Sequence, residues 1–95
     1  MILQVINGKT YNTATMTVLA SHSVYHNGNY AGDNSIRRTK SGALAYVSTS
    51  NGQDIYRASY IEAVTVEEAR QKIEGWKLND EEVVTLTAAG IIEEA

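Results

Sequence analysis

The stretch TATMTVLASHSVYH, residues 13–26, decides the fold that the sequence predicts. Every second residue from Ala14 to His26 belongs to a mainly apolar set, whereas the residues between them are mostly threonine and serine. This period of two, together with the β-branched side chains, indicates a strand, because a helix would scatter the threonines around its circumference. The segment is long for one strand, so we expect a bend or a bulge within it.

Turn signals on both sides of this stretch predict further strands. Asn7-Gly8 lies between two extended segments and predicts a hairpin, because both central residues of a type I′ turn need a positive φ. Residues 26–35, HNGNYAGDNS, are rich in Gly, Asn and Asp and are interpreted as an exposed loop. Beyond it we expect a meander of three antiparallel strands joined by turns at KSG and NGQ. These strands are SIRRT (35–39), ALAYVSTS (43–50) and DIYRASYIEAV (54–64).

The last third of the chain predicts helices. Thr65 and Glu68 have the spacing of a capping box, in which each side chain bonds the backbone N–H of the other residue. Asn79 and Glu82 form a second such pair, followed by a segment whose threonines lower its helix propensity. Strands followed by helices indicate a single α+β domain over residues 1–95. We expect an antiparallel sheet of about five strands, a hairpin plus a meander, with one or two C-terminal helices packed on one face.

The composition fits one small domain and excludes several kinds of site. The 95 residues include no cysteine, so disulfides, thiol chemistry and thiolate zinc sites are excluded. A chain without disulfides is compatible with the reducing environment of the cytosol. No apolar run is long enough to span a bilayer, and the first residues lack the basic start and apolar core of a secretory signal. We therefore expect a cytoplasmic protein without a membrane partner.

No group of residues predicts catalysis, a metal site or a cofactor. The two histidines, His22 and His26, share a face of the predicted strand but lie about 13 Å apart along it, too far to hold one metal ion. Neither Ser21 nor Ser23 stands in the Gly-x-Ser-x-Gly motif of a nucleophile. The glycines are spread singly, so they form no phosphate-binding loop. We therefore predict a protein that is not an enzyme and that uses no cofactor.

Positive charge is concentrated in the predicted meander. The net charge is −3, yet residues 1–60 carry five basic and two acidic residues, whereas residues 61–95 carry three basic and nine acidic ones. Half of the eight cations lie in one short region. They are Arg37, Arg38, Lys40 and Arg57. Such residues can protect an edge strand from aggregation, contact a protein partner or bind a nucleic-acid backbone. An acidic chain with so small a basic footprint makes nucleic acid an unlikely partner.

Tyrosine is the second indication of a binding surface. The chain has six tyrosines, one tryptophan and no phenylalanine. Tyrosine keeps a polar tip for water or a partner and is enriched with arginine at recognition surfaces. The alternative is that the tyrosines form cross-strand pairs within the sheet. The candidate partner-binding residues are Arg37, Arg38, Lys40, Arg57, Tyr25, Tyr30 and Tyr46.

Three stretches resemble, in the same order, a group of small proteins from phages and mobile elements. They are INGKTYNTAT (6–15), RRTKSGALAYV (37–47) and TVEEARQKIE (65–74). That group pairs an Ile-x-Gly-Lys-x-Tyr-Asn/Asp-Thr hairpin with a later Arg-x-Lys-x-Gly turn and a Thr-x-Glu-Glu-Ala helix start. This chain differs in having Arg37 where a tyrosine is usual, and Leu44 and Tyr46 where bulkier aromatic residues are expected.

The resemblance implies a function in blocking host defences. Proteins of this type tend to inhibit such defences by binding to them, and anti-CRISPR inhibitors are similar in size, acidity and lack of a cofactor. The implied partner is a host defence protein complex, contacted by the basic strand and the tyrosines or by an acidic helical face that mimics nucleic-acid phosphates. Two alternatives remain open: a nucleic-acid-binding accessory protein that uses Arg37, Arg38 and Lys40, and a structural protein that forms a homodimer or larger assembly through its sheet edges.

Overall fold

A computed structural model describes residues 1–50 and 59–95 of the chain. Over these residues it confirms the α+β class, with two helices packed on one face of an antiparallel sheet, and it has six strands rather than about five. The elements are β1 (Leu3–Ile6), β2 (Lys9–Asn12), a 3₁₀ turn (Thr13–Thr15), β3 (Thr17–His26), β4 (Asn29–Arg38), β5 (Leu44–Ser50), β6 (Tyr60–Val64), α1 (Val66–Ile73) and α2 (Asp80–Ala88).

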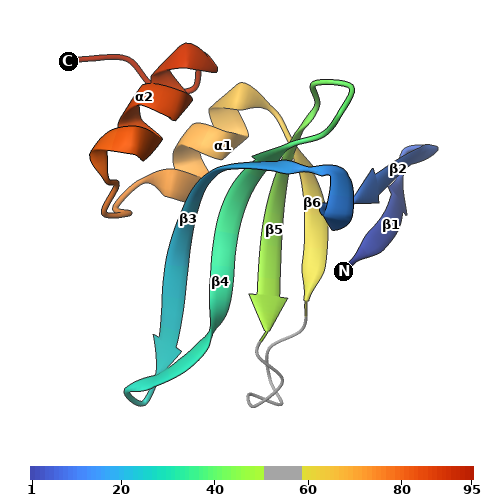
Figure 1. Ribbon diagram of the computed structural model, residues 1–95, viewed down its shortest axis with the longest axis horizontal. Coiled ribbons are helices and arrows are strands. Elements are labelled where there is room, and N and C mark those ends of the chain that lie inside the picture. Colours follow the sequence, from blue (N-terminus) through green and yellow to red (C-terminus); the bar gives the residue numbers. More distant parts are fainter. Residues whose placement is uncertain (51–58) are drawn as a thin grey trace.

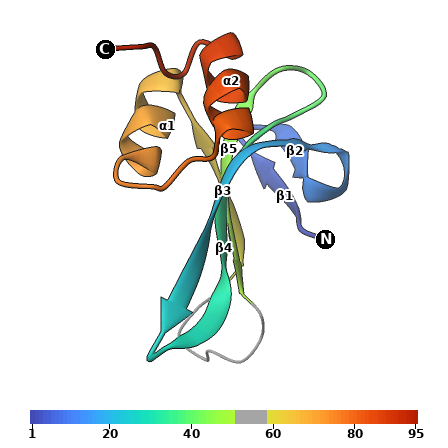
Figure 2. The same cartoon turned by 60° about the vertical axis from the view of Figure 1, so that its left-hand side comes forward.

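The strands form two sheets rather than one. Strands β3 to β6 make a four-stranded antiparallel meander in the order β3-β4-β5-β6, and β1 and β2 form a separate hairpin. The helices lie against one face of the meander and the β1–β2 hairpin lies near the same end on the other side (Figures 1 and 2). The opposite end of the meander, which carries the β3–β4 turn, projects beyond both (Figure 2).

Two apolar clusters hold these layers together. On the helix side, Ile36 and Tyr46 pack with residues of both helices and of the C-terminal segment, including Leu86 and Ile91, which are fully buried. On the hairpin side, Tyr11 packs with a second cluster that includes Val47. Because neighbouring residues of a strand point to opposite faces, Tyr46 and Val47 belong to different cores. A chain of this size thus divides its apolar residues between two thin layers.

The stretch of residues 13–26 begins with a turn and is extended from Thr17 onward. The Oδ1 atom of Asn12 accepts the N–H of Ala14 at 2.9 Å and caps the 3₁₀ turn, which is why residues 13–15 do not extend the strand. The expected irregularity is confirmed, because the β3–β4 register shifts between Val18 and Ala20 and again between Val24 and Tyr25. The first shift buries two consecutive residues, Leu19 and Ala20, on a strand whose sequence alternates regularly.

The prediction that residues 26–35 form a loop is wrong. Asn27 and Gly28, with φ values of 53° and 80°, make a two-residue turn, and β4 begins directly afterwards at Asn29. Their positive φ values are those a type I′ turn requires, and the same dipeptide forms the turn between β1 and β2. Asparagine and glycine are abundant here because they build a tight hairpin, and the polar residues that follow belong to a paired strand.

The basic strand is central in the sheet, so the interpretation of its arginines as edge protection is also wrong. Strand β4 pairs with β3 on one side and with β5 on the other. Arg37 lies between Val18 and Ala45 in this ladder. The outer strands of the meander are β3 and β6.

Side chains from other elements bond the outer edges of both β3 and β6. The carboxamide of Gln4 pairs with Ile61 on β6, donating from Nε2 to the carbonyl oxygen at 3.0 Å and accepting the backbone N–H at 3.2 Å. On β3, the N–H of Ser21 donates to Oε2 of Glu82 at 2.8 Å. These contacts occupy backbone groups that could otherwise pair with another strand.

Both helices begin as the sequence predicts. Thr65 and Glu68 bond each other's backbone N–H groups, as do Asn79 and Glu82, so both capping boxes are formed. Glu82 therefore has two functions, because one carboxylate oxygen caps α2 while the other bonds the edge of β3. This shared side chain attaches the start of α2 to the sheet.

We expect Gln4→Ala to lower the free energy of unfolding by about 1–2 kcal/mol, since two partly buried hydrogen bonds are lost. Urea denaturation followed by circular dichroism measures this change. Gln71→Ala is the matched control, because Gln71 is exposed on α1 and alanine is a good helix former. Equal midpoints for the two variants would show that Gln4 does not hold the hairpin to β6.

Candidate interaction surface

The residues predicted to contact a partner lie at two ends of the sheet. Tyr25 and Tyr30 stand at the projecting end, whereas Arg37 and Arg38 stand at the other end of β4. The nine residues from Tyr30 to Arg38 span about 26 Å of strand. Of the other members, Lys40 is in the β4–β5 turn and Tyr46 is in β5. Arg57 is outside the described residues.

The projecting end carries an exposed aromatic pair, which we call the tyrosine tip and define as Tyr25 and Tyr30. The two residues are opposite each other in the β3–β4 ladder, beside the Asn27-Gly28 turn. Their side chains are 65% and 42% exposed, and the rings meet edge to face with centroids 6.0 Å apart. Such a pair presents a large, amphipathic contact area to solvent.

Asp33 fixes the orientation of this tip. Its Oδ2 accepts the hydroxyl of Tyr30 at 2.6 Å, and its Oδ1 accepts the hydroxyl of Ser23 at 3.2 Å. The β4 backbone at Asp33 is in turn bonded to Thr49 on β5. The ring of Tyr30 is therefore held in place before any partner binds, which lowers the entropic cost of binding.

Tyr46 lies in the core rather than on the surface. It is 8% exposed, on the face of the sheet that the helices cover. The ammonium group of Lys72 lies 4.5 Å from the centre of its ring, and Lys72 also forms an ion pair with Glu62 at 3.6 Å. Tyr60 packs beside the same ring. In this position Tyr46 stabilises the contact between α1 and the sheet.

The basic residues do not form one continuous patch. Arg37 and Arg38 point to opposite faces of β4, as expected for neighbours on a strand. Arg37 is half-buried and donates from Nε to the hydroxyl of Ser35 at 2.8 Å. Burial lowers the pKa of Arg37, and the negative charge of Asp33 partly opposes this effect. Arg38 and Lys40 are left as the exposed cations of this end.

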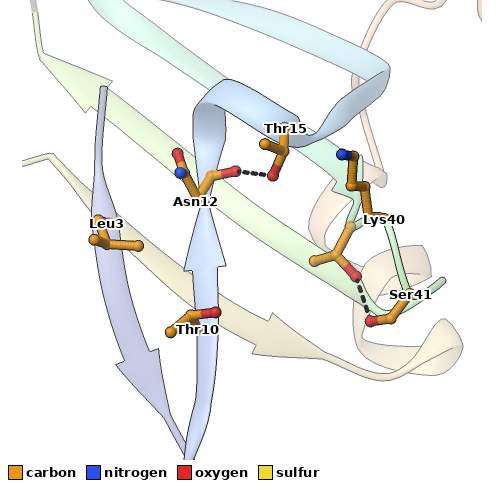
Figure 3. Close-up of a pocket in the computed structure, with 7 residues that line it drawn as sticks. Leu3, Thr10, Asn12, Thr15, Lys40 and Ser41 are labelled. Atoms are coloured by element: carbon orange, nitrogen blue, oxygen red, sulfur yellow. Dashed lines mark hydrogen bonds between the residues drawn. The ribbon is translucent and has the colours of Figure 1, made fainter.

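Lys40 lies on a shallow groove between the β1–β2 hairpin and the β4–β5 turn. Figure 3 shows the groove, whose volume is about 350 Å³. Its lining residues are polar apart from one leucine: Leu3, Thr10, Asn12, Thr15, Thr39, Lys40 and Ser41. The groove exists because the hairpin folds back beside a turn almost 30 residues further along the chain, so a local sequence pattern gives no sign of it.

One of the two histidines, His22, packs against the segment that joins the helices. His22 stacks on Trp76, with ring centroids 5.4 Å apart and planes inclined by 15°. Within residues 1–50 and 59–95, no three His, Cys, Asp or Glu side chains are grouped so that they could hold a metal ion. The stacking attaches the segment after α1 to β3.

Comparison of the chain with protein-family models, curated proteins and solved structures gave no match. In the described part of the chain, neither helix has the length and apolar character needed to cross a membrane. Any functional conclusion therefore depends on the surfaces described above and on the resemblance of the three sequence stretches.

Proposed function

We propose that this chain is a small cytoplasmic binding protein, of a phage or mobile-element type, that inhibits a host defence complex by covering the surface of one of its proteins. The observation that carries the proposal is the tyrosine tip at the projecting end of the sheet. Tyrosine side chains are frequent among the few residues that supply most of the binding energy in protein interfaces. The resemblance to anti-CRISPR-like proteins supplies the class of partner.

Several features support binding to a protein rather than to a nucleic acid. The tip stands at the end of a hairpin that projects from the rest of the fold, an arrangement suited to insertion into a partner's cleft (Figure 2). The carboxylate of Asp33 lies beside Tyr30 and would repel a phosphate backbone. Arg37 and Arg38 lie on opposite faces, so they cannot contact one strand of phosphates together.

A phage-plating assay tests the proposal. The chain is expressed in bacterial hosts that each carry one defined defence system, CRISPR–Cas systems included, and plaques of a targeted phage are counted. We expect one of these systems to be inhibited, so that plating on the defended host approaches plating on an undefended one. The Tyr25→Ala/Tyr30→Ala variant should lose this effect, whereas Tyr60→Ala, which removes a tyrosine of similar exposure, should keep it.

Two results would contradict the proposal. One is full defence in every host despite verified expression of a folded chain. The other is saturable binding to DNA or RNA at low salt with a steep loss of affinity as salt rises, which is the signature of phosphate contacts and would favour the nucleic-acid alternative.

A further inference from the structure

We propose that the groove beside Lys40 binds a carboxylate, supplied by a glutamate or aspartate of the protein partner. The side chains of the groove are the reason to expect a carboxylate as the ligand. That a protein partner supplies this carboxylate rests on the proposed function. The tyrosine tip and the groove lie at different ends of the sheet, so this contact is additional to the one described above.

Two side chains of the groove, those of Asn12 and Lys40, keep hydrogen-bond donors for a ligand. Asn12 uses its Oδ1 to accept the N–H of Ala14, so its NH₂ group remains available to a ligand. The hydroxyl of Thr15 donates to the backbone carbonyl of Asn12 at 3.2 Å (Figure 3). The hydroxyls of Thr39 and Ser41 bond each other at 3.2 Å. The unused donors are thus the NH₂ of Asn12 and the ammonium of Lys40, whereas the Thr15 hydroxyl, whose proton goes to the Asn12 carbonyl, can only accept.

The charge of the groove favours an anion. Lys40 is the single charged residue among those that line it, and no carboxylate of residues 1–50 or 59–95 pairs with it. A charge-assisted hydrogen bond from an ammonium group to a carboxylate is stronger than a bond between neutral groups. A ligand that is negatively charged and accepts hydrogen bonds therefore matches the groove in both respects.

The surroundings favour a carboxylate side chain over the phosphates of a nucleic acid. Leu3 forms an apolar wall and is 62% exposed, so the methylene groups of a glutamate could pack against it. A nucleic acid binds through a series of phosphate contacts, and this groove supplies one cation on a chain of net charge −3. The volume of about 350 Å³ lies at the lower end of the range for ligand pockets and is too small for a strand of several nucleotides.

An NMR titration of the ¹⁵N-labelled full chain tests this assignment. The probe is a triglutamate peptide with an acetylated N-terminus and an amidated C-terminus, and the matched triglutamine peptide is the neutral control. We expect triglutamate to shift the backbone amides of Thr10, Asn12 and Ser41 in a saturable manner, with little response to triglutamine. Lys40→Gln should weaken the binding about tenfold or more, whereas Lys9→Gln, which removes an exposed lysine outside the groove, should leave it unchanged.

Three results would overturn the proposal. Equal shifts with triglutamine would show that charge is not recognised. Unchanged affinity in the Lys40→Gln variant would place the binding elsewhere. Tighter binding of inorganic phosphate or of a short oligothymidylate to the same amides would assign the groove to phosphate. Because the assay needs no partner, failure of the phage-plating assay together with selective triglutamate binding would contradict only the proposed function.

Discussion

Replacing Ile36 by alanine is expected to lower the free energy of unfolding by about 2–5 kcal/mol. Ile36 is fully buried on the central strand β4, opposite Ala20 on β3 and Tyr46 on β5, and it packs in the cluster that joins the sheet to both helices. The alanine leaves a cavity that this cluster can close only in part. Since small domains are stable by about 5–15 kcal/mol, the variant should lose a large share of its stability.

Urea denaturation of Ile36→Ala, followed by circular dichroism, measures this loss. Val5→Ala is the control, because Val5 also lies on a strand but its side chain is 66% exposed on the outer face of β1. We expect the control to change stability by less than about 0.5 kcal/mol. If the two variants unfolded at the same urea concentration, the helix-side cluster would not be the main core.

Removal of the tyrosine tip should abolish binding without unfolding the chain. We expect Tyr25→Ala/Tyr30→Ala to weaken the affinity for a captured partner protein by about 100-fold or more, the size of effect typical of central aromatic contacts. Both side chains are exposed, and the turn between them is set by Asn27 and Gly28, so the hairpin should persist. Isothermal titration calorimetry gives the affinity, and the melting temperature shows that the fold is retained.

One single variant tests the role of a hydroxyl within the tip, and a second serves as its control outside the tip. Tyr30→Phe keeps the ring and removes the hydroxyl that donates to Asp33, so it should cost less than Tyr30→Ala. Tyr60→Ala is the matched control on β6 and should bind like the unmodified chain. If Tyr60→Ala weakened binding as much as the double variant, the tyrosine tip would not be the contact.

The sequence predicts those parts of the fold that depend on neighbouring residues. Each capping box is a contact between residues three apart, so Thr65 with Glu68 and Asn79 with Glu82 can be found without a structure. The alternation after Thr17 likewise identifies β3. The turn at Asn27 and Gly28 is equally visible, but the polar residues after it predict a loop because their strand partners are distant in the sequence.

The placement of the candidate residues could not be obtained in this way. The order of strands decides that Arg37 lies in a central strand, and strand order is set by pairing between β3, β4 and β5 rather than by local pattern. Tyr46 is covered because α1 brings Lys72 over its ring. The groove at Lys40 requires the hairpin and a later turn to meet. Contacts between distant segments therefore decide which candidate residues are exposed and which are buried.

Amide hydrogen exchange of the chain, alone and with a captured partner, is the most direct test of the claim that the projecting end of the sheet binds a protein. The account predicts that binding slows exchange around the β3–β4 turn, from Tyr25 to Tyr30, while the amides of α1 and α2 exchange at unchanged rates. Slowed exchange confined to the two helices, with the turn unaffected, would contradict the account and assign binding to the acidic helical face.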